Sequence, residues 1–214
     1  MTPILHLSSK DSLKKTVTLR RFKQSPLVLS LQAHCNLKEK MLLGIINSLL
    51  IDGGKDNTVL FKYRNRFNKM DFSYNKALCT NQGIDYLSYL FKAYSTTLIE
   101  IVLRGLYVVP IQLVDLKDLA VLKKLDISNN NLDNELFGQL VEGIKGRNLS
   151  SLNLSNTKIG YSQFVLLKVV PFTNLQLDVS YNAIQFEDDM EHKILPNMIK
   201  ASNMCSLNVG ILIK

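Results

Sequence analysis

The sequence has no tryptophan, only three cysteines among its 214 residues, and no apolar run that approaches the roughly 20 residues of a membrane-spanning helix. Cys35, Cys79 and Cys205 are odd in number, widely spaced and set in apolar surroundings, which favours reduced thiols over a disulfide framework. The first ten residues contain no sustained apolar stretch before their first charges, so we expect no secretory signal. These features favour a protein of the cytoplasm, a reducing compartment, that does not span a membrane.

Recognisable catalytic and metal-binding patterns are lacking as well. His6, His34 and His192 stand apart from any nucleophile or metal-ligand spacing, and the segment Asp52-Gly53-Gly54 is typical of a turn rather than a phosphate-binding loop. We therefore expect no enzyme, no cofactor and no metal site.

Positive charge is in excess, but only in the first third of the chain. Residues 1–66 contain 12 Lys and Arg against 4 Asp and Glu, a net of 12 − 4 = +8, whereas the 14 basic and 14 acidic residues of 67–214 cancel. Clustered basic residues gain affinity for phosphates by releasing counterions, although most charge runs of this size are solvated surface. The candidate phosphate contacts are Arg20, Arg21, Arg64 and Arg66.

The most informative feature present is an internal repeat. Residues 122–132 (LKKLDISNNNL) match the template L-x-x-L-x-L-x-x-N-x-L at every defined position. Residues 149–159 match it with Thr157 in the Asn position, and residues 174–184 match from their second position onward. With the weaker matches, copies start near 67, 98, 122, 149, 174 and 204, so the mean spacing is (204 − 67)/5, about 27 residues.

Each conserved position of the template has a physical purpose. The two leucines of L-x-L point to the same side of a short strand, while the residue between them points to the other side. An Asn side chain after the strand can satisfy backbone groups in its own turn and in the neighbouring turn. Thr157 can do part of this, and Leu106, which fills the Asn position of the copy at 98, cannot.

Helical periodicity follows the strands. Leu132, Leu136, Leu140 and Ile144 recur at four-residue steps, and Ile84 to Phe91 carries a second apolar helix face. Each copy is thus predicted to form a strand, a turn and a helix. Stacked copies would share one core, which predicts an α/β fold with a curved parallel sheet inside and helices outside.

The repeat resembles the ribonuclease-inhibitor type of leucine-rich repeat, in which each copy carries a full helix. The pattern Asn75-x-Ala77-Leu78…Gly83-Ile84-x-x-Leu87 is especially similar to that class. The resemblance covers residues 67–214 and departs from the family at Leu106, at Asn174 in the first leucine position, and in the irregular spacing. It implies a leucine-rich-repeat solenoid, with local distortion expected in the copies at 98 and 174.

Residues 1–66 are predicted to form a basic N-terminal capping region, and a degenerate repeat within it is the alternative left open. Thr16–Leu19 and Leu27–Leu31 alternate like short strands, and residues 37–50 carry a helical pattern. At the other end, no helical pattern follows Leu207–Val209, which leaves open a truncated end or an end paired with a partner.

The resemblance implies a concave strand face that binds a protein partner, here polar, mildly acidic and suited to a basic surface. The predicted contact residues are Asp71, Ser73, Tyr74, Val102, Arg104, Asp126, Ser128, Asn153, Ser155, Asp178, Ser180 and Tyr181. Asp, Asn and Ser are also common fillers of this repeat, so scaffold consensus is the competing interpretation. Arg104 and the tyrosines are the least generic members, because both residue types are favoured interface anchors.

Two other functions stay open. An adaptor recruited to anionic membrane or RNA through the basic N-terminal third is the first. The second follows from composition, since short leucine-rich-repeat proteins rich in Lys, Asn, Ile and Leu resemble effectors that intracellular bacteria deliver into host cells. AT-rich coding produces the same composition in unrelated organisms.

Overall fold

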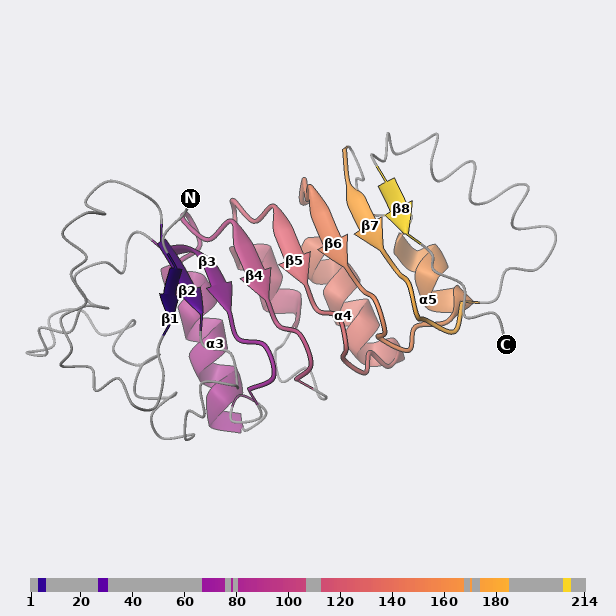
Figure 1. The fold of residues 1–214 in the computed structure, drawn as a ribbon, viewed down its shortest axis with the longest axis horizontal. Helices are drawn as coiled ribbons and strands as arrows, with labels where there is room; N and C mark the ends of the chain where they lie inside the picture. Colours follow the sequence, from indigo (N-terminus) through magenta and orange to yellow (C-terminus); the bar gives the residue numbers. More distant parts are fainter. Residues whose placement is uncertain are drawn as a thin grey trace, which may run out of the picture.

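The computed structural model describes residues 4–6, 27–30, 67–75, 78, 81–106, 113–167, 170, 174–184 and 206–208. Within these residues, eight parallel strands form one sheet in sequence order (Figure 1). The strands are β1 (Ile4–His6), β2 (Leu27–Ser30), β3 (Phe67–Asp71), β4 (Glu100–Val102), β5 (Lys124–Asp126), β6 (Ser151–Asn153), β7 (Gln176–Asp178) and β8 (Ser206–Asn208).

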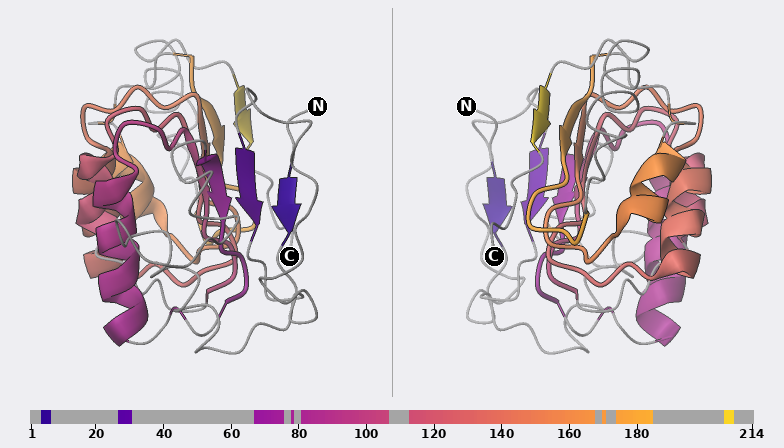
Figure 2. Two further views of the ribbon diagram at one scale, coloured as in Figure 1. Left: turned by 90° about the vertical axis from the view of Figure 1, so that its left-hand side faces the viewer. Right: turned by 90° about the vertical axis from the view of Figure 1, so that its right-hand side faces the viewer.

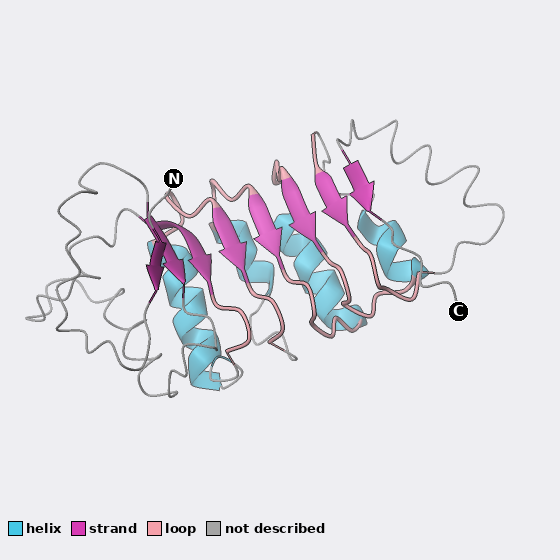
Figure 3. Ribbon diagram, viewed as in Figure 1, coloured by secondary structure: helices cyan, strands magenta, loops and turns pink. Residues whose placement is uncertain are grey.

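Helices lie on one face of this sheet. They are α3 (Asn81–Ala93), the 3-10 helix η5 (Leu113–Asp118), α4 (Asn134–Ile144) and α5 (Tyr161–Leu166). Each follows one strand and precedes the next, and Figures 2 and 3 show all of them on the same side of the strands. The predicted α/β class with a parallel sheet is confirmed. We call the side of the sheet opposite the helices the open face.

Each copy from 67 onward supplies one strand, and the copies are in register. The inward leucine position of each strand lies opposite that of the next. The residues at this position are Met70, Ile101, Leu125, Leu152, Leu177 and Leu207. Strand pairing therefore continues through the copies at 98 and 174, where we expected distortion.

The two copies differ from the others in the segments outside their strands, not in the strands themselves. The copy at 98 is only 24 residues long, and a short 3-10 helix, η5, follows its strand instead of a full α-helix. In the copy at 174, Asn174 is exposed with φ of +61° and Leu175 is fully buried. The core of this copy is therefore filled by Leu175, the residue after the first template position, rather than by Asn174.

The core lies between the sheet and the helices. Leu125 and Ile127 alternate inward from β5, and the predicted helix face of α4 is buried through Leu140 and Ile144. Side chains of this size each contribute roughly 1.5 to 3 kcal/mol when fully buried. Leu132 is buried before the helix, and the face of α3 is buried through Leu87, Leu90 and Phe91. Both predicted helices are confirmed, but Leu136 is only partly buried, and Phe137 and Val141 complete the buried face of α4.

The N-terminal part of the sheet extends the same register. The predicted strand at 27–31 is confirmed over Leu27–Ser30, and Leu29 lies opposite Met70. We did not predict β1, in which Leu5 lies opposite Leu29. Its signal was present, because Leu5-His6-Leu7 precedes Leu29-Ser30-Leu31 by 24 residues. The predicted strand at 16–19 and helix at 37–50 lie outside the described residues.

Candidate binding surface on the open face

In β3, β5, β6 and β7 an acidic or amide residue follows the inward position, and its side chain bonds back to its own chain, whereas β4 has Val102 there. Each uses one side-chain oxygen, Oδ1, to accept hydrogen bonds from the serine two residues later. The backbone N–H distances are 3.0 Å for Asp71 and Ser73, 3.0 Å for Asp126 and Ser128, 3.0 Å for Asn153 and Ser155, and 2.9 Å for Asp178 and Ser180. This bond turns the backbone at the end of each strand.

Several predicted contact residues therefore present little surface. Ser73, Ser128 and Ser180 are buried, as are Asp71 and Val102. For Asp71 and the three serines, the hydrogen bond at the strand end explains the residue type without a partner, and Val102 is simply buried. The scaffold interpretation of the repeated Asp-x-Ser pattern is supported at these positions.

The remaining predicted residues do reach the surface. Tyr181 is 63% exposed and Tyr74 is 40% exposed. The side chain of Arg104 is 41% exposed and that of Asp126 17%. The half-buried members of the set are Asn153, Ser155 and Asp178.

Arg104 is held in place by the next copy. Its Nε donates to Ser128 Oγ at 3.1 Å, and its Nη2 donates to Asp126 Oδ2 at 2.5 Å. The hydrogen bond to Asp126, followed by the attraction of its charge, raises the pKa of Arg104. The guanidinium is therefore a fixed cation, positioned by two bonds on a neighbouring strand.

A column of left-handed residues runs across the copies just after the strands. Tyr74, Gly105, Asn129, Asn156 and Tyr181 occupy the same template position, and their φ angles lie between +52° and +63°. Gly and Asn adopt this conformation readily, whereas Tyr rarely does. We refer to these five residues as the left-handed column.

Side chains of the left-handed column bond to one another. Asn156 Nδ2 donates to Asn129 Oδ1 at 2.9 Å, and Asn129 Nδ2 reaches Tyr74 Oη at 3.5 Å. Our set of predicted contacts omitted Gly105, Asn129 and Asn156. The signal for all three was their shared template position directly before the Asn position.

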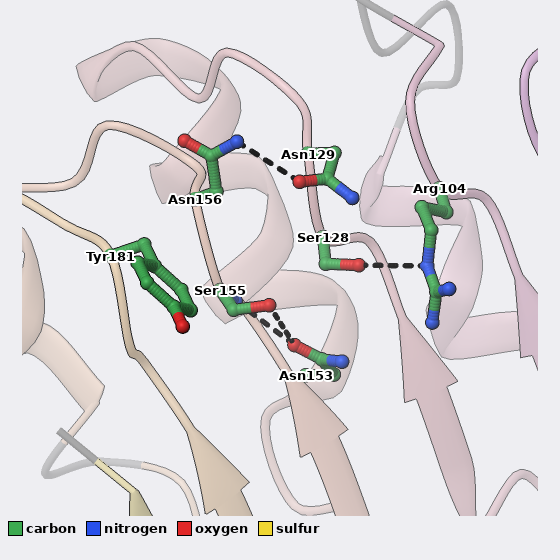
Figure 4. Close-up of a pocket in the computed structure, with 7 residues that line it drawn as sticks. All are labelled: Arg104, Ser128, Asn129, Asn153, Ser155, Asn156 and Tyr181. Atoms are coloured by element: carbon green, nitrogen blue, oxygen red, sulfur yellow. Dashed lines mark hydrogen bonds between the residues drawn. The ribbon is translucent and has the colours of Figure 1, made fainter. Parts of the chain in front are cut away.

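Three residues of the left-handed column, Asn129, Asn156 and Tyr181, border a hollow of about 470 Å³ on the open face. Figure 4 shows Arg104 on one side and Tyr181 on the other, with polar side chains between them. The lining consists of Arg104, Ser128, Asn129, Asn153, Ser155, Asn156 and Tyr181. The structure thus brings together two of the three least generic predicted residues, Arg104 and Tyr181, which come from copies separated by two intervening strands, whereas Tyr74 does not line the hollow.

The other predicted sites have no counterpart in the described part of the chain. The candidate phosphate contacts Arg20, Arg21, Arg64 and Arg66 lie outside it. Among the described residues, no group of three His, Cys, Asp or Glu side chains could hold a metal ion, and no helix has the length and apolarity to cross a membrane.

Comparison with known proteins gives no family for this chain. No protein-family model matches the sequence, and no curated protein is significantly similar to it. The open face must therefore be interpreted from its own chemistry.

Proposed function

We propose that the chain is a leucine-rich-repeat solenoid of the ribonuclease-inhibitor type, and that it is a non-enzymatic module binding a protein partner on its open face. One observation carries the binding proposal: an exposed Tyr181 and a fixed Arg104 border the same polar hollow. Tyr and Arg are enriched among residues that dominate binding energy.

The asparagine positions support the repeat class. Asn130 Oδ1 accepts from Leu106 N at 2.7 Å, and its Nδ2 donates to Leu103 O at 2.9 Å and to Ile127 O at 2.7 Å. One side chain thus bonds to the turn of its own copy and to that of the preceding copy. Asn182 does the same for its own turn and for Leu154 O, at 2.8 Å. This bonding explains why Asn recurs at the template position.

The geometry of the open face supports binding by a partner. Helices cover the opposite face, so the strand side is free of helical cover within the described residues (Figure 2). The side chains around the hollow are held by hydrogen bonds to neighbouring copies, which reduces the entropy lost on binding. Tyr181 supplies a large contact area with few rotatable bonds.

The test replaces the two anchors by the residues that neighbouring copies carry. Arg104→Ser restores the serine of the adjacent strands, and Tyr181→Asn keeps a residue that tolerates the left-handed backbone. The matched control is Tyr89→Asn, because Tyr89 is 60% exposed on the helix side. Each variant is used for affinity capture from lysate, with and without nuclease treatment, at two salt concentrations.

We expect the Arg104→Ser/Tyr181→Asn variant to lose a partner that the wild type and Tyr89→Asn retain, with affinity at least about tenfold weaker. Equal capture by all three proteins would contradict the placement of the site. Capture that disappears with nuclease or modest salt would instead support the adaptor function of residues 1–66, whose net charge of +8 accounts for the whole excess of the chain.

A further inference from the structure

Asp71, Asp126, Asn153 and Asp178 each end a strand and carry one side-chain atom, Oδ2 or Nδ2, that does not bond to the following serine. This atom determines what each copy presents to a partner. The inner oxygen is occupied by the following serine in every case described above. The other terminal atom is an acceptor, Oδ2, in Asp and a donor, Nδ2, in Asn. The copies share one backbone geometry, but the outward atom is a hydrogen-bond acceptor where the residue is Asp and a donor where it is Asn.

Along the open face, some of these outward side-chain atoms have a bonding partner and others have none among the described residues. Asp126 Oδ2 is taken by Arg104, and the charges of Lys69 and Glu100 also pair with each other. Asn153 is uncharged. Asp178 Oδ2 forms no hydrogen bond or ion pair with any described residue. The β7 copy consequently carries an uncompensated carboxylate within this part of the chain.

Two described cations of the open face, Lys124 and Arg104, are separated from Asp178 by at least one intervening strand. Lys124 belongs to β5, two strands away, and Arg104 follows β4, three strands away. At a strand spacing of about 4.8 Å, these backbones lie on the order of 10 and 14 Å from β7. Such separations equal or exceed the Debye length of about 8 Å at physiological salt.

An exposed aromatic residue, Tyr181, lies close to Asp178 in the sequence. Tyr181 follows Asp178 by three residues, is 63% exposed and lines the hollow. In Figure 4 its ring lies at the edge of the hollow near Ser155. Aromatic faces attract Lys and Arg side chains, and an ion pair adds to this attraction.

We propose that the partner inserts a basic side chain, Arg or Lys, between Asp178 and the ring of Tyr181. Asn153, the register partner of Asp178 on β6, then offers its Nδ2 to a backbone carbonyl of the same partner segment. This inference rests on the proposed function and adds the chemistry of the partner: an extended basic segment lying across β6 and β7.

A conservative exchange of charge tests this assignment. Asp178→Asn removes the charge and retains the bond to the following serine, because Asn153 already makes that bond to Ser155 at 3.0 Å. Asn153→Asp is the reciprocal variant and adds a carboxylate one strand away. The probe is N-acetyl-arginine amide, titrated into the full-length ¹⁵N-labelled chain at low salt. N-acetyl-citrulline amide serves as its uncharged counterpart.

We expect saturable amide shifts at Ser180 and Tyr181 with the arginine probe and none with the citrulline probe. Asp178→Asn should weaken the binding of the arginine probe about three- to tenfold, and Asn153→Asp should strengthen it. An affinity that is unchanged in Asp178→Asn would overturn the assignment, as would equal binding of the citrulline probe or no saturable binding at all.

The two proposals fail in different ways. If Asp178→Asn captures the same partner from lysate as the wild type while Arg104→Ser/Tyr181→Asn loses it, the open face binds a partner and the basic anchor is wrong. If neither variant changes capture, the proposed function itself fails. Loss of capture in both variants, together with the expected response of the arginine probe, supports both proposals.

Discussion

The ring of Tyr74 lies across Gly105, in the space that a side chain at position 105 would need. A β-carbon on Gly105 would stand 2.2 Å from Tyr74 Cε1 and 2.3 Å from Cδ1, and the backbone there has φ of +63°. Because no side chain intervenes, Tyr74 Oη reaches Asn129 Nδ2, which follows the strand two further along the sheet, at 3.5 Å. Glycine is therefore required at position 105 for both its shape and its backbone conformation.

Gly105→Ala should lower the free energy of unfolding by about 2 to 4 kcal/mol, because the added methyl group meets a ring and the left-handed backbone is strained. Urea unfolding followed by circular dichroism measures the change. The second variant, Tyr74→Asn/Gly105→Ala, removes the ring and should recover all but about 1 kcal/mol of the loss. If this double variant is no more stable than Gly105→Ala, the steric explanation is wrong.

Asn130→Ala should be among the most destabilising substitutions on the strand side. Asn130 is 4% exposed, and its amide bonds to Leu106 N, Leu103 O and Ile127 O. Its loss leaves three buried backbone groups short of a partner, so we expect a cost of about 3 to 5 kcal/mol. The adjacent Asn131 is exposed, and Asn131→Ala should change stability by less than about 0.5 kcal/mol. Comparable losses in the two variants would refute this account.

The strands were predictable because each template position meets a local physical requirement. The inward leucines, the asparagine turns and the partial substitute Thr157 behave as expected, and Thr157 Oγ1 donates to Leu154 O at 2.7 Å. Leu106 shows how a departure is tolerated. Its side chain cannot donate, but Asn130 of the following copy supplies the bonds to Leu103 and Leu106.

The accessible part of the surface was harder to predict. Alternation places Asp71, Asp126 and Asp178 on the open face, yet it says nothing of how much of each side chain remains exposed. Exposure depends on bonds to the following serine and on neighbours such as Arg104, which comes from a different copy. The repeat places Tyr74 and Gly105 at equivalent positions of neighbouring copies, but it does not indicate that the ring of Tyr74 lies across Gly105.

Helix α4 provides two glycines that make opposite predictions for the same chemical change. A β-carbon on Gly143 would lie 2.1 Å from the carbonyl oxygen of Leu113 and 3.2 Å from Leu116 Cβ, because α4 packs directly on η5 there. Backbone atoms cannot move aside as a flexible side chain can. We therefore expect Gly143→Ala to cost about 3 kcal/mol or more in the free energy of unfolding.

Gly138→Ala adds the same methyl group to the same helix, where it meets no atom within 4 Å. Alanine is the better helix former by about 1 kcal/mol, so this variant should be as stable as the wild type or more stable by up to that amount. The urea concentrations at the unfolding midpoints of Gly143→Ala and Gly138→Ala are compared, provided that the dependence of the unfolding free energy on urea is the same in both. Their difference separates the packing effect from helix propensity. Similar midpoints would mean that α4 does not approach η5 as closely as the backbone geometry requires.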